Sequence, residues 1–251
     1  MSKRRKSPVK PPSVEPQMCD LNMRLSILHG TPFFAQLPHA DVEQINLLFR
    51  EYGYTSGETI YFSGDPATHL YVVASGQIKL LRHSVTGQDV LVDVLSPGEF
   101  FGSLSALEEA AYSDTAQAQT GVCVLGIAVE DFRALLARYP SVALTVLDLT
   151  SKRLQEAHEM LRQISAHSVE KRIAYVLLKL GDKLGEAGDE GLLIQMPLTR
   201  DDIAQMTGTT TETASRIMSQ FQKDGLIESG RQWVAIADGE RLAHIAEENG
   251  G

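Results

Sequence analysis

The spacing of hydrophobic residues changes twice along the chain, and each change marks a different kind of structure. Between residues 21 and 51 the apolar positions recur at helical spacing. Between residues 53 and 127 short apolar or alternating runs are separated by turns that contain glycine, such as Ser63-Gly-Asp-Pro66. Many short strands with regular turns are typical of a β-barrel or sandwich. After residue 128 helical spacing returns, so the pattern predicts an α+β protein in which helices follow a β-rich domain.

A long helix is predicted from about residue 141 to residue 167, after a short helix over 129–138 that ends before Pro140. Leu147, Leu154 and Leu161 recur at every seventh position, which is typical of a two-stranded coiled coil. Packing of this helix on its own domain is the alternative. We expect a homodimer whose interface consists of Leu147, Thr150, Leu154, Ala157, Leu161 and Ile164.

The last third of the chain alternates helical and extended patterns. An amphipathic helix is predicted over 168–183, a loop over 185–191 and a strand over 192–196. Two helices with a tight bend follow over 198–221, then a hairpin over 225–236 and a closing helix over 238–248. A helical pair between a preceding helix and a hairpin is the order expected of a winged helix-turn-helix.

Within residues 198–221, Thr199 can cap the first helix and Gly208 lies where the chain must reverse. The second helix, capped by Thr210 or Thr211, has an apolar stripe formed by Ala214, Ile217, Met218 and Phe221. Its opposite face carries Thr211, Glu212, Ser215 and Arg216, which can donate and accept hydrogen bonds as a major-groove reader must. An ordinary helical hairpin is the alternative, and the predicted wing favours the DNA-binding interpretation.

Composition places further bounds. The 251 residues suffice for two domains, and 43% hydrophobic with 22% charged residues is typical of a globular protein. No apolar run reaches membrane-spanning length, and the basic start of the chain is not followed by the apolar segment of a secretory signal. We therefore expect a cytoplasmic protein without a membrane partner, with residues 1–20 as a disordered tail. The formal net charge of −9 counts against nucleic-acid binding but leaves room for a local basic patch.

In its order of elements the chain resembles the CRP/FNR family of bacterial transcription regulators. Residues 63–80 are similar to the family's β-roll signature, 97–104 to its effector-pocket segment and 198–221 to its DNA-reading unit. The resemblance implies a cyclic-nucleotide-binding-like β-roll sensor over 21–138, a dimerisation helix over 139–167 and a winged helix-turn-helix over 168–251. It also implies a homodimer that binds double-stranded promoter DNA and works with RNA polymerase.

The resemblance assigns roles to the second helix of the reading unit. Glu212, Ser215 and Arg216 follow the FNR-type pattern, because Thr211 stands where the CRP subtype has an arginine. Arg216 can donate twice to guanine and Glu212 can accept from cytosine, while Ser215 or Thr211 makes smaller contacts. The expected DNA contacts are made by Thr199, Arg200, Thr210, Thr211, Glu212, Ser215 and Arg216, with Thr199 and Arg200 facing phosphate. The implied target is a palindrome of the type TTGAT-N4-ATCAA.

The effector is harder to predict. The family's pocket maps onto Gly98, Glu99, Ser103, Tyr112, Ser113 and His158. Ser103 stands where cAMP-responsive members have their ribose-binding glutamate, and Tyr112 where they have their phosphate-binding arginine. Ala157 and His158 replace the threonine and serine that meet the adenine. A buried phosphate without its arginine lacks a partner that is difficult to replace, so cAMP is not expected.

Cys19 and Cys123 lie where the FNR subgroup has two of its cluster ligands, and the other two positions fall near Asn22 and Leu28. Because a cluster is held by four thiolates, a [4Fe–4S] site within the chain is not expected. The two cysteines could form a thiol–disulfide switch. The preferred interpretation is an exposed Cys19 and a buried, inert Cys123 between two valines.

Haem is a further option, since His158 would face the pocket, and control by abundance without any effector is another. The resident cofactor therefore stays unassigned. The sequence contains no phosphate-binding loop, HExxH or GxSxG motif, so we do not expect an enzyme. The alternative function is a ligand-sensing regulatory module whose DNA binding is secondary, and residues 198–221 argue against it.

Overall fold

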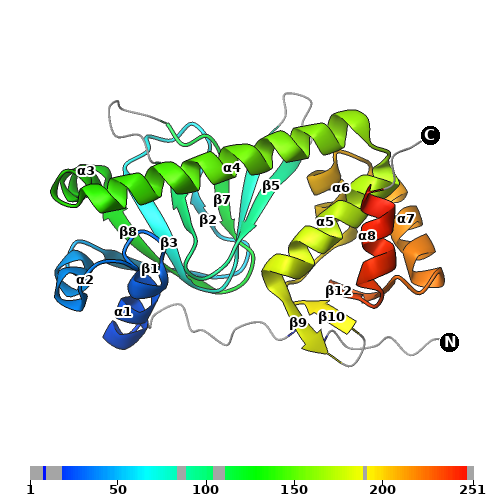
Figure 1. The fold of residues 1–251 in the computed structure, drawn as a ribbon, viewed down its shortest axis with the longest axis horizontal. Coiled ribbons are helices and arrows are strands. Elements are labelled where there is room, and N and C mark those ends of the chain that lie inside the picture. Colours follow the sequence, from blue (N-terminus) through cyan, green and yellow to red (C-terminus); the bar gives the residue numbers. More distant parts are fainter. Residues whose placement is uncertain (1–7, 10–18, 84–88, 104–110, 189–190, 248–251) are drawn as a thin grey trace. The chain divides into compact units, whose positions relative to one another are not determined.

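The computed structural model describes residues 8–9, 19–83, 89–103, 111–188 and 191–247. These residues form two compact units, one made mainly by Pro12–Arg82 and Val92–Gln155 and the other mainly by Glu156–Gly251 (Figure 1). The first unit begins with two helices, α1 (Leu21–Gly30) and α2 (His39–Asn46). Its strands are β1 (Arg50–Tyr54), β2 (Thr59–Tyr61), β3 (His69–Ser75), β4 (Ile78–His83), β5 (Asp89–Leu95), β6 (Phe100–Gly102), β7 (Thr115–Ala118) and β8 (Val122–Ala128).

The strands make the two sheets of a β-roll, with orders β1-β8-β3-β6 and β2-β7-β4-β5. Strand β8 lies between β1 and β3, antiparallel to both, with Leu125 opposite Val72 of β3. Both residues are fully buried, as expected for apolar residues in a strand that is paired on both sides. The β-rich domain predicted from the glycine-punctuated runs is confirmed, in the form of the β-roll that the family resemblance implies.

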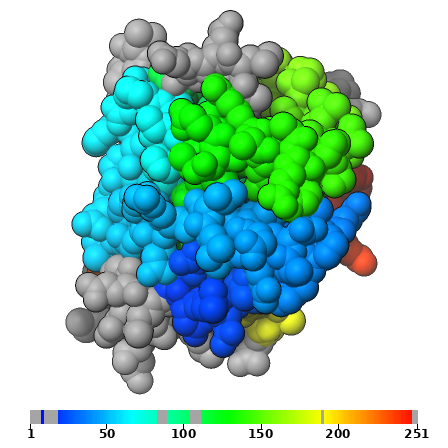
Figure 2. Space-filling model, turned by 90° about the vertical axis from the view of Figure 1, so that its left-hand side faces the viewer, coloured from blue at the N-terminus to red at the C-terminus, as the bar shows by residue number. Residues whose placement is uncertain are grey.

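Two helices follow the β-roll, α3 (Val129–Arg138) and α4 (Pro140–Ala166). Val142 is buried in the core between α1, α2 and the first sheet, where Val146 and Leu149 also pack. Figure 2 shows this end of the unit, where the dark-blue surface of α1 lies beside the lighter blue of α2, which in turn borders the green surface of α3 and α4. Arg153 of α4 donates a hydrogen bond to the Phe100 carbonyl at 2.6 Å and lies 3.7 Å above that residue's ring.

The second unit contains a winged helix-turn-helix. Its core forms where the apolar faces of the helices meet a small sheet of order β11-β12-β10-β9, with Ile173, Phe221 and Trp233 fully buried. The elements are α5 (Val169–Leu184), β9 (Gly185–Gly188), β10 (Gly191–Ile194), α6 (Arg200–Thr207), α7 (Thr211–Lys223), β11 (Ile227–Gly230), β12 (Trp233–Ile236) and α8 (Gly239–Glu247).

Two stretches differ from the sequence-based expectation. Residues 185–188, expected in a loop, form strand β9 and pair with β10, because backbone hydrogen bonds require no apolar pattern. Most of the expected disordered tail lies outside the described residues, but Val9 is buried against Trp233 and Ala235 of β12. No helix in the described part of the chain is long and apolar enough to cross a membrane.

Candidate nucleic-acid interface and sensor interior

The bend between α6 and α7 is held by local hydrogen bonds. Thr199 and Asp202 form a capping box, in which the Thr199 amide donates to the Asp202 carboxylate at 2.8 Å and the Asp202 amide donates to the Thr199 hydroxyl at 3.1 Å. Gly208 ends α6 with a φ of 61°, a left-handed conformation that favours glycine. Thr210 caps α7 by accepting from the Thr213 amide at 3.2 Å. These contacts fix where α7 begins and which face it presents.

Helix α7 is divided into a buried and an open face. Ala214, Met218 and Phe221 are fully buried against the core of the unit. Glu212 and Arg216 are exposed, and no described residue makes a hydrogen bond or ion pair with either side chain. Ser215 lies between them and is half-buried. The exposed face is thus available to donate to and accept from the edges of base pairs.

Thr211 and Arg200 have partners inside the protein. The Thr211 hydroxyl donates to Asp201 of α6 at 2.8 Å, which joins the two helices of the reading unit. Arg200 donates to the Ser229 hydroxyl of β11 at 2.8 Å, and burial lowers the pKa of its guanidinium. The expected phosphate contact of Arg200 therefore competes with a contact that fastens α6 to the wing.

The interior of the β-roll at the family's phosphate position is filled by aromatic rings. Tyr112 is only 6% exposed and stacks on Tyr61 with ring centroids 3.7 Å apart. The Tyr112 hydroxyl donates to the His69 carbonyl at 3.2 Å and accepts from the His69 amide at 3.1 Å. Tyr71 and Phe101 continue the cluster, with centroids 5.1 Å apart. Burial raises the pKa of Tyr61 and Tyr71, so these rings are neutral members of the core.

The other predicted pocket residues lie in separate turns or make separate local hydrogen bonds. Gly98 lies in a turn with a φ of 87°, and Glu99 closes that turn by accepting from the Ser96 amide at 2.8 Å. The Ser103 amide donates to the His69 carbonyl, which brings it to the same residue as Tyr112, and the Ser113 hydroxyl donates to Asp114. His158 is exposed on α4 and belongs to the other compact unit. The part of the expected pocket segment after Ser103 lies outside the described residues.

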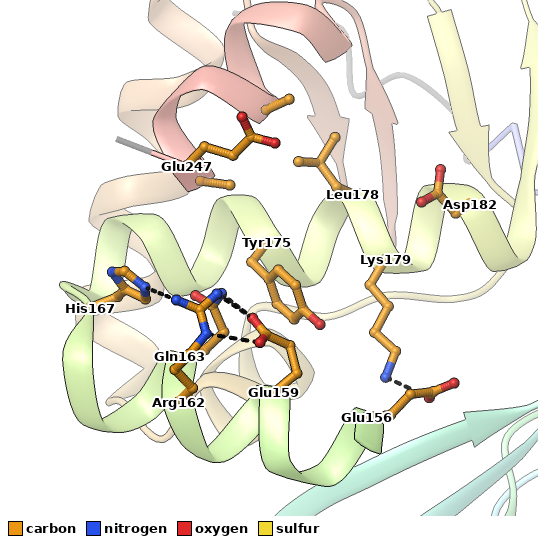
Figure 3. Close-up of a pocket in the computed structure, with 12 residues that line it drawn as sticks. Glu156, Glu159, Arg162, Gln163, His167, Tyr175, Leu178, Lys179, Asp182 and Glu247 are labelled. Carbon is orange, nitrogen blue, oxygen red and sulfur yellow. Dashed lines mark hydrogen bonds and ion pairs between the residues drawn. The ribbon is translucent and has the colours of Figure 1, made fainter. Parts of the chain in front are cut away.

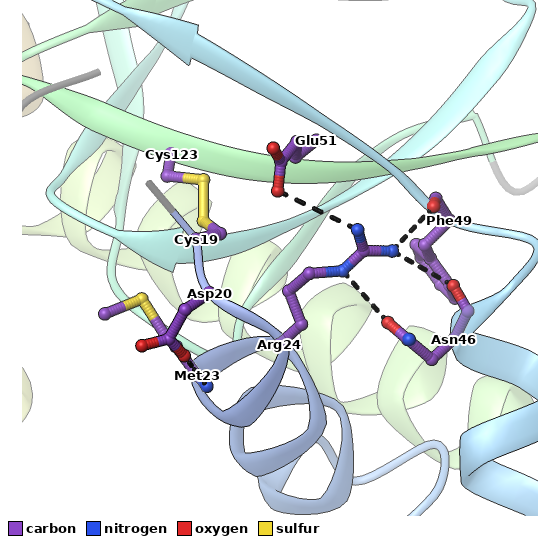
Figure 4. A network of polar contacts seen from close by, with 8 residues as sticks. All are labelled: Cys19, Asp20, Met23, Arg24, Asn46, Phe49, Glu51 and Cys123. Carbon is purple, nitrogen blue, oxygen red and sulfur yellow. Dashed lines mark hydrogen bonds and ion pairs between the residues drawn. A yellow bond between two sulfur atoms is a disulfide. The ribbon is translucent and has the colours of Figure 1, made fainter. Parts of the chain in front are cut away.

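The expectation of an exposed Cys19 is wrong, while the expected burial of Cys123 is confirmed. The two residues are joined by a disulfide, with their Cα atoms 6.5 Å apart, and they are 5% and 2% exposed (Figure 4). The error arose because residue spacing cannot show that the start of α1 reaches strand β8. The described residues contain no group of three or more histidine, cysteine or acidic side chains placed to hold a metal ion.

A cavity of about 560 Å³ lies in the second unit and was not predicted from the sequence (Figure 3). Ion pairs cross it or line it, between Lys179 and Glu156 at 3.1 Å and between Arg162 and Glu159 at 2.6 Å. Hydrogen bonds from Arg162 and Gln163 lower the pKa of the Glu159 carboxyl to about 2. The sequence feature that could have indicated this cavity is the recurrence of Glu156, Glu159 and Gln163 on one face of α4. The same pattern is usual for a solvent-exposed helix face.

Comparisons with known proteins agree with this architecture. Residues 53–139 match the family described as the Cyclic nucleotide-binding domain, and residues 171–245 match the Crp-like helix-turn-helix domain. The structure of FixK2 from Bradyrhizobium japonicum is similar with a TM-score of 0.71 and 24% identity, covering 80% of this chain and 99% of that one. At this identity the likeness concerns the fold.

Relatives are similar along most of their length. The Cyclic AMP receptor protein of Thermus thermophilus is 32% identical over 219 residues, which are 87% of this chain and 98% of the relative. The Transcriptional activator protein FnrA of Stutzerimonas stutzeri is 27% identical over 76% of this chain and 78% of its own. The chain belongs to the CRP/FNR family of transcription regulators and carries the family's helix-turn-helix DNA-binding domain.

Proposed function

We propose that this chain is a homodimeric regulator that binds a palindrome of the type TTGAT-N4-ATCAA. The observation that carries the proposal is the open face of α7, where Glu212 and Arg216 are exposed while the opposite face is buried. Arg216 donates twice to the O6 and N7 atoms of a guanine, and Glu212 accepts from the amino group of a cytosine. Ser215 and Thr211 make the smaller contacts beside them.

Phosphate contacts position the reader. Helices α6 and α7 begin after Thr199 and Thr210, and helix starts favour phosphate. With a formal net charge of −9, the chain gains little from non-specific attraction to DNA. Binding is therefore expected to depend on the specific contacts to the bases.

The proposed dimer forms along α4. Leu147, Leu154 and Leu161 are 64%, 57% and 62% exposed, and together they make an apolar stripe along the helix. Large apolar side chains repeated on one face of a long helix are buried most readily by the same face of a second copy. A two-fold dimer also presents two α7 helices to the two halves of a palindrome, about one helical turn apart.

We also propose that cAMP is not the effector, although a 32% identical relative is named a cyclic AMP receptor protein. The cyclic phosphate needs a cationic partner, and the corresponding position holds Tyr112, stacked on Tyr61 and bonded to the His69 backbone. On family grounds the protein is proposed to act in the cytoplasm together with RNA polymerase.

The function is tested by titrating the full-length protein into a fluorescent TTGAT-N4-ATCAA duplex and into a scrambled duplex of equal length. Wild type is expected to prefer the palindrome, with no change on adding millimolar cAMP. Arg216→Ala is expected to lose about 1–3 kcal/mol of preference at one guanine of each half-site. Lys223→Ala, at the far end of α7, removes an equal charge and is the control. If Arg216→Ala keeps full sequence preference, the assignment of the reading face is wrong.

A further inference from the structure

The Cys19–Cys123 disulfide fastens the beginning of α1 to the middle of the first sheet. Cys19 directly precedes Asp20, which caps α1 by accepting from the Met23 amide at 2.7 Å. Cys123 lies in β8 and is paired with Gly53 of β1 on one side and Ser75 of β3 on the other. These are the only cysteines in the chain, and 104 positions separate them. One end of the bridge is therefore a helix terminus and the other a strand held from both sides.

Besides the disulfide, this half of α1 is held by Met23, which packs against the core, and by the polar contacts of Arg24. Leu28, near the end of the helix, is its only fully buried residue, while Leu21 in the first turn is 59% exposed. The main polar anchor is Arg24, which donates to the Asn46 side chain at 3.0 Å and to the Phe49 carbonyl at 2.8 Å (Figure 4). Breaking the disulfide removes the covalent attachment and leaves the partly buried Met23 and Arg24 to keep the start of α1 docked.

The bridge is buried in the core that supports the start of the proposed dimer helix. Cys19 and Cys123 belong to the same apolar cluster as Phe100 of β6 and Val142 of α4. Phe100 in turn accepts a hydrogen bond from Arg153, further along α4. Packing changes at the start of α1 can thus reach α4 through one contiguous, close-packed core.

We propose that Cys19 and Cys123 form a reversible redox site that sets the DNA affinity of this regulator, with the disulfide form as the tighter binder. This inference rests on the proposed function, because a DNA-binding protein works in a reducing compartment, where disulfides are usually transient and sensing. The signal is a hydroperoxide, and a low-potential dithiol restores the thiols.

The chemistry is a two-electron exchange. The Cys19 thiolate, at the helix terminus that opens first, attacks the hydroperoxide; the O–O bond breaks, and an alcohol (water, for hydrogen peroxide) leaves. Cys123 then attacks the Cys19 sulfenic acid, the S–S bond forms, and water leaves. In the reverse direction a dithiol exchanges with the disulfide, is itself oxidised to a disulfide, and returns both cysteines to thiols.

The first test follows the bond in the full-length protein. Samples equilibrated with dithiothreitol at stepped ratios of oxidised to reduced reagent are alkylated and weighed by mass spectrometry. We expect one reversible transition in which both thiols appear together. A disulfide that native dithiothreitol cannot reduce, or that hydrogen peroxide cannot re-form, overturns the proposal.

The second test measures affinity for the TTGAT-N4-ATCAA duplex in the two states. We expect the disulfide form to bind at least about tenfold more tightly, a coupling of ordinary size for allosteric proteins. Cys19→Ser and Cys123→Ser each leave one thiol, and both are expected to bind like the reduced wild type with or without peroxide. Equal affinities of the oxidised and reduced wild type, or a response that survives in one single variant, overturn the proposal.

Hydrogen exchange separates this inference from the function on which it rests. Reduction is expected to speed exchange of the amides in the first turns of α1 by at least about tenfold, while those of α7 do not change. If neither state binds the duplex, the DNA-binding proposal fails and exchange at α1 alone decides whether the pair is a switch. Identical exchange in the two states overturns the redox proposal.

Discussion

The positions that the family resemblance marks as functional are exposed on α7 but buried in the interior of the β-roll. On α7 the proposed reading residues Glu212 and Arg216 are exposed, and the other face of the helix is buried. In the β-roll Tyr112, which the resemblance aligns with the phosphate-binding arginine of cAMP-responsive members, is buried and stacked. An exposed residue can serve binding at little cost to folding, whereas a buried ring serves folding. The difference agrees with our proposal that α7 reads DNA and that the β-roll does not take cAMP.

The largest effect on DNA affinity is expected from a substitution in the exposed stripe of α4. Leu154→Glu places a charge in the proposed dimer seam, yet Leu154 is 57% exposed in the single chain, so the fold should survive. Loss of the second reading helix removes the advantage of binding two linked half-sites, which is worth roughly 100-fold or more. Sedimentation should find a monomer at micromolar concentration, and DNA titration should show that loss. Gln155→Glu, one residue along, is the control, and a dimeric Leu154→Glu would refute the seam.

The second prediction compares a buried residue, whose truncation should lower stability, with an exposed residue, whose truncation should weaken DNA binding. Tyr112→Ala removes a buried ring and should cost about 3–5 kcal/mol of unfolding free energy, as large aromatic truncations in cores do. Glu212→Ala, on the exposed face of α7, should change unfolding by no more than about 0.5 kcal/mol but weaken binding to the palindrome. Urea unfolding monitored by circular dichroism gives the first quantity, and duplex titration gives the second. Equal losses of unfolding free energy in the two variants would contradict the difference between the buried and the exposed position.

The smallest effect is a pH dependence in the β-roll. Burial, opposed by Glu130, lowers the pKa of His69, whose backbone holds the Tyr112 hydroxyl. Since the folded pKa lies below the unfolded value of about 6.5, the neutral form is favoured on folding, and stability is lost as pH falls from that value through the folded pKa. His69→Gln should flatten this part of the profile. If the unfolding free energies of wild type and variant change in parallel between pH 7 and 5, His69 does not cause this pH dependence.

Local patterns explain how much of the fold could be predicted. The change from helical to alternating spacing located the β-roll, and the Thr199–Gly208–Thr210 series located the bend between α6 and α7, because caps and turns depend on neighbouring residues. The exposed leucines of α4 follow from their seven-residue spacing. Strand β9 escaped prediction because Gly185–Gly188 has no apolar alternation and pairs through its backbone alone.

The amino-acid sequence alone determined the order of elements, the division of α7 into a polar and an apolar face, and the apolar stripe of α4. Each of these depends on residues a few positions apart. Only the tertiary structure decided the contacts between distant segments. It brought Cys19 to Cys123 across 104 positions, stacked Tyr61 on Tyr112, and turned Arg200 toward Ser229 of the wing. Such pairs depend on how the sheets and helices pack. The spacing of residues along the chain carries no information about how close two distant residues lie in space.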